Sequence, residues 1–158
     1  MQYSILKTEL GKFGILTSKS NLIKIILPNK IKLASMKLTN PNSYTPLMKN
    51  VINQMNQYFI GSRKEFDIRL KLELPPFYER ALNEVRKIPY GQTFSYKKIA
   101  RKLQNPKAFR AVANANAINP LPIIIPCHRV ILSNGNFGQY GGGELMKKIL
   151  VQNEMNNN

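Results

Sequence analysis

The chain has very little of three chemically distinctive residues: one cysteine, one histidine and no tryptophan among 158 residues. A single cysteine excludes an internal disulfide and suits a reducing compartment. One cysteine with one histidine cannot supply the four ligands of a usual structural zinc site, so we expect no metal site. The two residues are Cys127 and His128, and their adjacency is the first indication of a reactive centre.

A long apolar run is also missing. No segment approaches the roughly 18 to 20 consecutive apolar residues of a membrane-spanning helix. Met1–Lys12 includes Glu9 and has no long apolar stretch, so it does not resemble a secretory signal. We therefore expect a cytoplasmic protein without a membrane partner. The length suits one compact domain or two small lobes, and a hydrophobic content of 43% is enough for a core.

Acidic residues are scarce, with 8 Asp and Glu against 24 Lys and Arg and a net charge of +16. None lies between Glu84 and Glu144, a stretch that includes nine basic residues and the Cys–His pair. Basic surfaces commonly bind polyanions through phosphate contacts and counterion release. The alternative is a lysine-rich surface that only keeps the protein in solution. Because charge of one sign surrounds the Cys–His pair, we favour a nucleic-acid-binding face.

The first half of the chain predicts a small sheet with a helix. An antiparallel meander is expected from three strand-like segments: Gln2–Leu6, Phe13–Thr17 and Leu22–Leu27. Residues 28–45 look like a loop with room for one short strand. Thr45 is a candidate N-cap for a helix that ends near Gly61. Phe66–Leu70 then predicts a further strand of the sheet.

The second half predicts mainly helices. Leu74-Pro75-Pro76 marks a boundary, so we expect lobes at residues 1–74 and 75–158. Helices are expected over residues 77–88, Tyr96–Leu103, residues 106–116 and Leu145–Asn153, with Met155–Asn158 as a frayed tail. Thr93 or Ser95 can cap the second of these helices. The expected fold class is α/β (α+β), with a small N-terminal antiparallel sheet-plus-helix lobe and a mostly helical C-terminal lobe.

The two middle helices form a candidate helix-turn-helix, because both are short, basic and joined by a tight turn at Gln104-Asn105-Pro106. The second helix consists largely of small side chains, which would let its backbone approach DNA closely. Arg110 is the only long side chain among residues 110–116. The alternative is an ordinary helical hairpin with a solvated basic face.

The Cys–His pair follows Ile123–Ile125, an apolar run that predicts a buried strand or strand-like segment. An imidazole near a thiol can hold it deprotonated, and the thiolate is the reactive form. The alternative is a lone cysteine that acts as a small buried hydrophobe. Adjacent residues of a strand point to opposite faces, so cooperation needs a turn or a bridging water. Pro126 favours a turn. The glycine-rich stretch 133–143 fits no phosphate-binding fingerprint and suits a loop that closes over a flat ligand.

Four segments in this order resemble the O6-alkylguanine-DNA alkyltransferases, also called methylated-DNA–protein-cysteine methyltransferases. They are Asn105–Val112, Asn119-Pro120, Ile125–Val130 and Gly138–Gly142, within a resemblance that covers roughly residues 76–154. The resemblance implies a DNA repair protein that flips O6-alkylguanine out of double-stranded DNA and transfers the alkyl group irreversibly to a cysteine. We expect it to need no cofactor and to act as a monomer.

The resemblance also implies roles for single residues. Cys127 would accept the alkyl group, His128 would deprotonate it through a water, and Asn119 would hold the turn before the site. Either Glu144 or Glu154 could hold the imidazole on sequence grounds, and the family spacing selects Glu154. Tyr96 would donate a proton or hydrogen bond to the leaving guanine and help rotate the phosphate. Arg110 would fill the gap left by the flipped base, beside other DNA-binding residues: Ala111, Ala113, Tyr96, Lys107 and Arg101. Lining the base pocket would be Pro122, Val130, Tyr140 and Gly141, with backbone carbonyls of Cys127 and Val130 facing the guanine amino group.

Two positions depart from the family pattern: Ala113 replaces a frequent glycine, and Gly141 replaces a frequent serine or other small residue. The chemistry is nevertheless coherent, since a base inside a duplex must be extruded before a protein can react with it. The thioether product resists water, so the protein should act once. Two rival functions are a cysteine hydrolase, which would turn over many times, and a non-catalytic damage-sensing protein, against which Cys127 argues.

Overall fold

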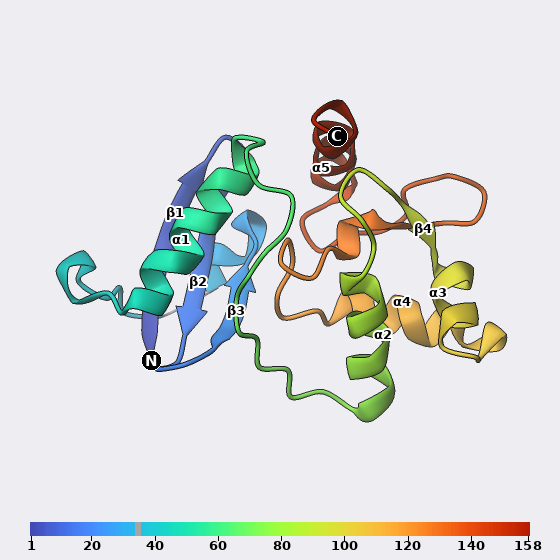
Figure 1. Cartoon of the computed structure of the whole chain (residues 1–158), viewed down its shortest axis with the longest axis horizontal. Helices are drawn as coiled ribbons and strands as arrows, with labels where there is room; N and C mark the ends of the chain where they lie inside the picture. The colour runs from blue at the N-terminus through green and yellow to red at the C-terminus, as the bar shows by residue number, and fades with distance from the viewer. Residues whose placement is uncertain (34–35) are drawn as a thin grey trace. The chain divides into compact units, whose positions relative to one another are not determined.

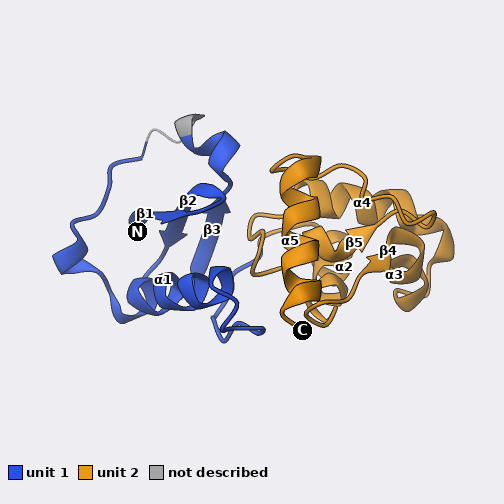
Figure 2. Cartoon of the chain, turned by 90° about the horizontal axis from the view of Figure 1, so that it is seen from above, with its two compact units in different colours: residues 1–72 blue, residues 73–158 orange. Residues whose placement is uncertain are grey.

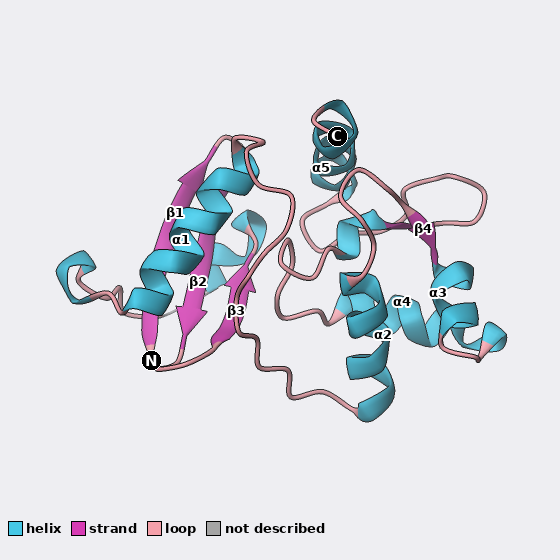
Figure 3. Ribbon diagram, in the orientation of Figure 1, coloured by secondary structure: helices cyan, strands magenta, loops and turns pink. Residues whose placement is uncertain are grey.

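The computed structural model describes residues 1–33 and 36–158. These form two compact units, Met1–Leu72 and Glu73–Asn158 (Figure 2). The division lies two residues before the boundary expected from the sequence. The first unit combines strands with one long helix and the second is mainly helical, which confirms the α/β class (Figure 3). None of the helices in the described residues is long and apolar enough to cross a membrane.

The first unit is an antiparallel meander covered by one helix. Its strands pair in the order β1, β2, β3, as predicted, and span β1 (Gln2–Thr8), β2 (Gly11–Thr17) and β3 (Leu22–Ile26). Helix α1 (Pro46–Phe59) packs on the sheet (Figure 1), with the rings of Phe13 and Phe59 5.0 Å apart. Thr45 caps this helix as predicted, since its Oγ1 accepts from the Met48 N–H at 3.2 Å.

Two predictions for this unit need correction. The strand over Phe66–Leu70 is wrong, because only a single bridge joins Leu22 to Leu70. The Gln54 side chain instead donates to the Asp67 carbonyl and accepts from the Asp67 N–H, each at 2.9 Å. These backbone groups are therefore not free to pair with a neighbouring strand. The described part of residues 28–45 holds two 3₁₀ turns, Pro28–Leu33 and Pro41–Ser43, and no strand. Ala34 and Ser35 lie outside the described residues.

The second unit surrounds α4 (Phe109–Ala117) with α2 (Pro76–Arg86) and α3 (Tyr96–Lys102). A 3₁₀ turn, Pro106–Ala108, joins α3 to α4. Ser95, rather than Thr93, caps α3 by accepting from the Lys98 N–H at 3.0 Å. The unit also contains a two-stranded parallel sheet and the last helix: β4 (Phe94–Ser95), β5 (Val130–Ile131) and α5 (Glu144–Asn156). Since α5 includes Met155 and Asn156, the prediction of a frayed tail from Met155 is wrong.

The apolar run before the Cys–His pair is a buried turn. Ile123 has a φ of 75°, a rare conformation for a β-branched residue, and the Ile125 N–H donates to the Leu121 carbonyl at 2.8 Å. The predicted strand is therefore wrong, although all three isoleucines are buried. Burial selects apolar residues in a turn as in a strand, so the run alone does not distinguish them. After Pro126 the chain enters a 3₁₀ turn, η4 (Cys127–Arg129).

Candidate active site

Cys127 begins η4 and is only 6% exposed. Burial raises the pKa of its thiol above the ordinary value. The Asn119 side chain, the Lys147 ammonium and the backbone N–H groups of Cys127 and His128 act in the opposite direction. The resting residue is therefore a protonated thiol, surrounded by groups that would stabilise a thiolate once it forms.

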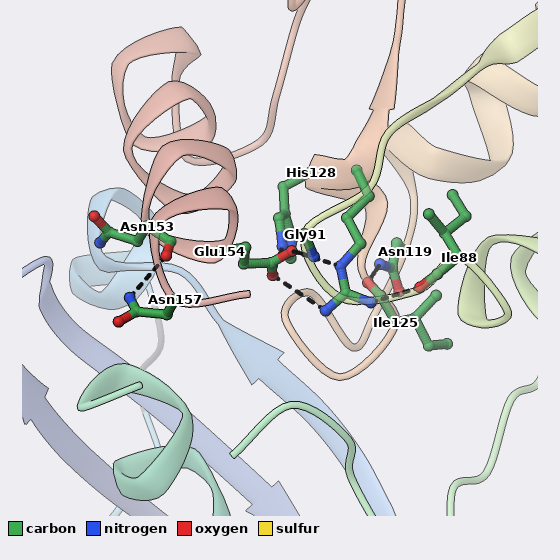
Figure 4. Close-up of polar contacts among 9 residues, drawn as sticks. Ile88, Gly91, Asn119, Ile125, His128, Asn153, Glu154 and Asn157 are labelled. Carbon is green, nitrogen blue, oxygen red and sulfur yellow. Dashed lines mark hydrogen bonds and ion pairs between the residues drawn. The ribbon is translucent and has the colours of Figure 1, made fainter. Parts of the chain in front are cut away.

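His128 is fully buried, and its Nε2 lies 2.6 Å from Oε1 of Glu154 (Figure 4). Burial lowers the pKa of the imidazole, although Glu154 raises it, so the ring is neutral near pH 7. If Nε2 carries the proton that Glu154 accepts, Nδ1 carries the lone pair. This arrangement supplies a buried base directly after the only thiol.

Arg129, which the sequence analysis did not single out, completes this charge cluster. Its Nε and Nη2 donate to the two oxygens of Glu154 at 2.8 and 3.1 Å, and its Nη1 donates to the Ile88 carbonyl at 2.7 Å. The Gly91 N–H adds a longer bond of 3.3 Å to the carboxylate. Burial acts to raise the pKa of Glu154, but His128 and Arg129 outweigh it and lower the pKa to about 2. The sequence does indicate the pairing of Arg129, because an arginine within an apolar segment generally needs a carboxylate partner.

Lys147 is a second functional candidate that the sequence analysis missed. It is fully buried, and its Nζ donates to the Phe137 and Gln139 carbonyls at 2.5 and 3.3 Å. Nζ also lies 5.8 Å from the centre of the Tyr96 ring. Burial lowers its pKa to about 8, against the influence of Cys127 and Glu144. Lys147 precedes Glu154 by two helical turns on α5, and this shared helix face was the available signal.

Two phenols and two amides complete the surroundings of Cys127. Burial and the nearby thiol raise the pKa of Tyr96, and the Asn116 side chain lowers it in part. Burial raises the pKa of Tyr140 well above its ordinary value, and its ring lies 6.5 Å from that of His128. Both phenols are therefore protonated donors. Asn119 spans the turn before η4, since it donates to the Ile125 carbonyl and accepts from the Leu121 N–H, each at 2.9 Å.

A cavity of about 490 Å³ lies between the helix-turn-helix and residues 132–139. Tyr96, Arg110 and Ala113 line its helical side, and Gln139 belongs to the opposite side. Its volume is in the range of small-molecule sites. Tyr96 thus belongs to the cavity and also lies near Cys127, which connects the basic helices with the reactive centre.

The remaining predicted site residues lie around this centre in different ways. Val130 is buried, and its backbone pairs with Phe94 in the parallel sheet. Pro122 is buried in the turn before η4, and Gly141 is exposed in the segment before α5. Among the predicted DNA-binding residues, Ala111 is half-buried on α4, whereas Arg101 and Lys107 are exposed and do not line the cavity.

Comparison with known proteins covers both units. Residues 1–72 match the family model described as "6-O-methylguanine DNA methyltransferase, ribonuclease-like domain". Residues 76–156 match the one described as "6-O-methylguanine DNA methyltransferase, DNA binding domain". The methylated-DNA–protein-cysteine methyltransferase of Methanosarcina mazei is 35% identical over 160 residues, covering 99% of each chain.

Solved structures show the same likeness. Mycobacterium tuberculosis OGT in complex with DNA matches with a TM-score of 0.84 and 33% identity, over 99% of this chain and 94% of that one. An O6-methylguanine DNA methyltransferase from Methanococcus jannaschii matches with a TM-score of 0.71 and 29% identity, over 96% and 93% of the two chains. Since the two family models together account for nearly all of the sequence, this chain belongs to the O6-methylguanine DNA methyltransferase family.

Proposed function

We propose that Cys127 is the residue to which this DNA alkyltransferase transfers the alkyl group of O6-alkylguanine, once per protein molecule. The observation that carries the proposal is the position of the only thiol: it is buried next to an imidazole–carboxylate pair, in the unit that also holds the basic helix-turn-helix. A soft thiolate is well suited to displacement at a saturated carbon. The thioether product is stable to water, so no second turnover follows.

The proton of the thiol would pass to His128, whose Nε2 is held by Glu154. The sulfur forms a bond to the alkyl carbon while the bond from that carbon to guanine O6 breaks. The electron pair of the broken bond stays on the guanine, to which Tyr96 donates a hydrogen bond or its proton. A proton given up by Tyr96 is replaced through solvent by the one that His128 took from the thiol, so the guanine leaves neutral. Asn119 would keep the turn before η4 in place, because its amide bonds two backbone groups of that turn.

The alkylated base would reach the thiol by rotation out of the duplex. Arg110 is exposed on α4 at the wall of the cavity, a place from which its side chain can fill the gap in the base stack. Pro122, Val130, Tyr140 and Gly141 would line the base pocket, and the carbonyls of Cys127 and Val130 would accept from the guanine amino group.

The DNA backbone would be held by the exposed basic side chains of the helix-turn-helix. Arg101 and Lys107 would contact phosphates, while Ala111 and Ala113 allow a close approach of α4. Ala113 leaves slightly less room than the frequent glycine of the family. We further propose that the protein acts as a monomer in the cytoplasm on double-stranded DNA that contains O6-alkylguanine.

The test is a mass spectrum of the intact protein after incubation with duplex DNA that contains O6-methylguanine. One methyl mass per chain on Cys127 is expected, and Cys127→Ser should lose the transfer but still bind DNA. Methyl on another residue would refute the assignment of Cys127. Many turnovers per chain would favour a cysteine hydrolase, and DNA binding without any mass change would favour a damage sensor.

A further inference from the structure

Asn116, near the end of α4, has an unusual environment. Its side-chain oxygen and nitrogen are both buried, and neither has a hydrogen-bond partner among the residues that the structure describes. Asn119, three residues later, uses both ends of its amide on the backbone of the turn before η4. Buried amides in folded proteins are generally bonded, because an unpaired one loses its hydration without compensation. The fold therefore keeps Asn116 at a cost that its packing does not explain.

The position of Asn116 points toward the site. Arg110 and Ala113 line the cavity, and Asn116 follows Ala113 by three residues, so it continues the same stripe of α4 toward the interior. Its amide interacts with the Tyr96 hydroxyl, since it opposes the rise in the pKa of that phenol that burial and Cys127 cause. The two groups nevertheless form no hydrogen bond of ordinary geometry in this state.

We propose that Asn116 is a positioning residue whose side-chain N–H donates to the Tyr96 hydroxyl oxygen while that hydroxyl donates to the leaving guanine. The inference rests on the proposed function, because it concerns how Tyr96 serves alkyl transfer to Cys127. The amide would be short of a partner in the resting protein and would gain one during the reaction.

The chemistry of the step favours a neutral donor at this place. As the carbon–oxygen bond of the substrate breaks, its electron pair moves onto the guanine, which draws the hydroxyl hydrogen of Tyr96. Negative charge then grows on the Tyr96 oxygen, and an amide N–H can stabilise it without giving up a proton. Over the whole reaction the proton lost by the thiol balances the one gained by the guanine. Asn116 therefore ends unchanged.

Asn116→Leu, a nearly isosteric change, separates this role from a structural one. Single-turnover transfer from O6-methylguanine duplex DNA is measured over a range of DNA concentrations, together with the thermal midpoint. We expect the limiting rate to fall about tenfold, as for the loss of one hydrogen bond in the transition state, with the half-saturating DNA concentration unchanged. The thermal midpoint should rise by about 2 °C or more, because an unpaired buried amide is removed.

Two further variants complete the experiment. Asn83→Leu, at an exposed position of α2, is the matched control and should leave the transfer rate as in the original chain. In a Tyr96→Phe background, Asn116→Leu should cause no further loss of rate, because the hydroxyl through which Asn116 acts is gone.

The outcomes separate the two proposals. Transfer to Cys127 with an unchanged rate in Asn116→Leu would overturn the role of Asn116 and leave the proposed function standing. The role of Asn116 would also be overturned if Asn116→Leu lost as much rate in the Tyr96→Phe background as in the original chain. A loss of rate together with a lower thermal midpoint would overturn it as well. Absence of methyl on Cys127 in the unaltered chain would overturn both.

Discussion

At the scale of single residues, Glu154 holds the site together because one buried carboxylate accepts hydrogen bonds from both His128 and Arg129. Glu154→Gln removes the charge that neutralises a buried guanidinium, and breaking a buried ion pair in this way typically costs about 3–5 kcal/mol. We expect a large fall in the free energy of unfolding, measured by urea denaturation, and slower alkyl transfer. Glu9→Gln, at an exposed position of the first unit, is the control and should change neither.

The low pKa of Glu154 also predicts acid sensitivity. Because its folded pKa is about 2 and its ordinary value is 4.5, the carboxylate contributes stability that is complete above pH 4.5 and lost as the pH falls toward 2. The thermal midpoint of the unaltered chain should therefore drop more steeply over this range than that of Glu154→Gln. Parallel curves for the two proteins would contradict the assignment of the lowered pKa.

Lys147 predicts a second rise of stability with pH, at the alkaline end of the range. Its folded pKa is about 8 against an ordinary 10.5, so the unfolded chain binds more protons between these values and stability should rise with pH. Lys147→Met should remove this rise, as thermal unfolding between pH 7.5 and 10.5 would show. It should also slow alkyl transfer, because the thiolate loses a buried cation. Lys148→Met replaces the exposed neighbour and should keep both properties.

At the scale of elements, α4 presents Arg110 at the wall of the cavity. Arg110→Ala should slow repair of duplex DNA far more than reaction with free O6-benzylguanine. A free base needs no extrusion, whereas extrusion from a duplex costs a few kcal/mol of unpairing and unstacking that an inserted side chain offsets. Rates for the two substrates, measured side by side, test this. Equal losses would show that Arg110 does not act as a wedge.

The sequence predicted those elements whose signals are local. Strand-like runs identified the meander, and the hydroxyls of Thr45 and Ser95 marked helix starts because a cap bonds a backbone group three residues away. Prediction from the sequence failed where tertiary contacts decide the local structure. Phe66–Leu70 has a strand-like composition, but a glutamine from α1 takes its backbone groups. Ile123–Ile125 reads as a strand because burial, rather than pairing, selected its residues.

The site residues were likewise predictable only where the sequence itself marks them. Cys127 and His128 stand out because each is the only residue of its type, and the resemblance to a family supplied Glu154, Tyr96 and Arg110. Lys147 was missed because a lysine on a helix is ordinarily exposed, and only the helix face that it shares with Glu154 indicated its burial. Asn116 likewise looks like any other asparagine of α4 until its surroundings are known.

At the scale of the whole molecule, the +16 charge predicts strongly salt-dependent binding to DNA of any sequence. Small side chains on α4 offer little to read base edges, so phosphate contacts should dominate. Affinity, measured by fluorescence anisotropy, should fall by orders of magnitude between about 50 and 200 mM salt if several contacts form. Lys97→Ala or Arg101→Ala should each lower the salt slope by about one. An affinity that is flat in salt, or a preference for one undamaged sequence, would refute this model.

The charge is spread over both units. Half of the 24 basic residues and only three of the 8 acidic ones lie in residues 1–72, outside the helix-turn-helix. Nonspecific attraction to DNA is therefore a property of the whole chain, whereas the reactive residues all belong to the second unit.

The burial of Cys127 also bears on how the protein survives before it meets DNA. A thiol that reacts once is wasted if peroxide or another electrophile consumes it first, and such reagents attack exposed cysteines of low pKa. Cys127 is almost enclosed and its pKa is raised, so it should be a poor target for oxidation in the absence of substrate. The enclosure that slows general thiol chemistry thus preserves the capacity of each molecule for its single repair.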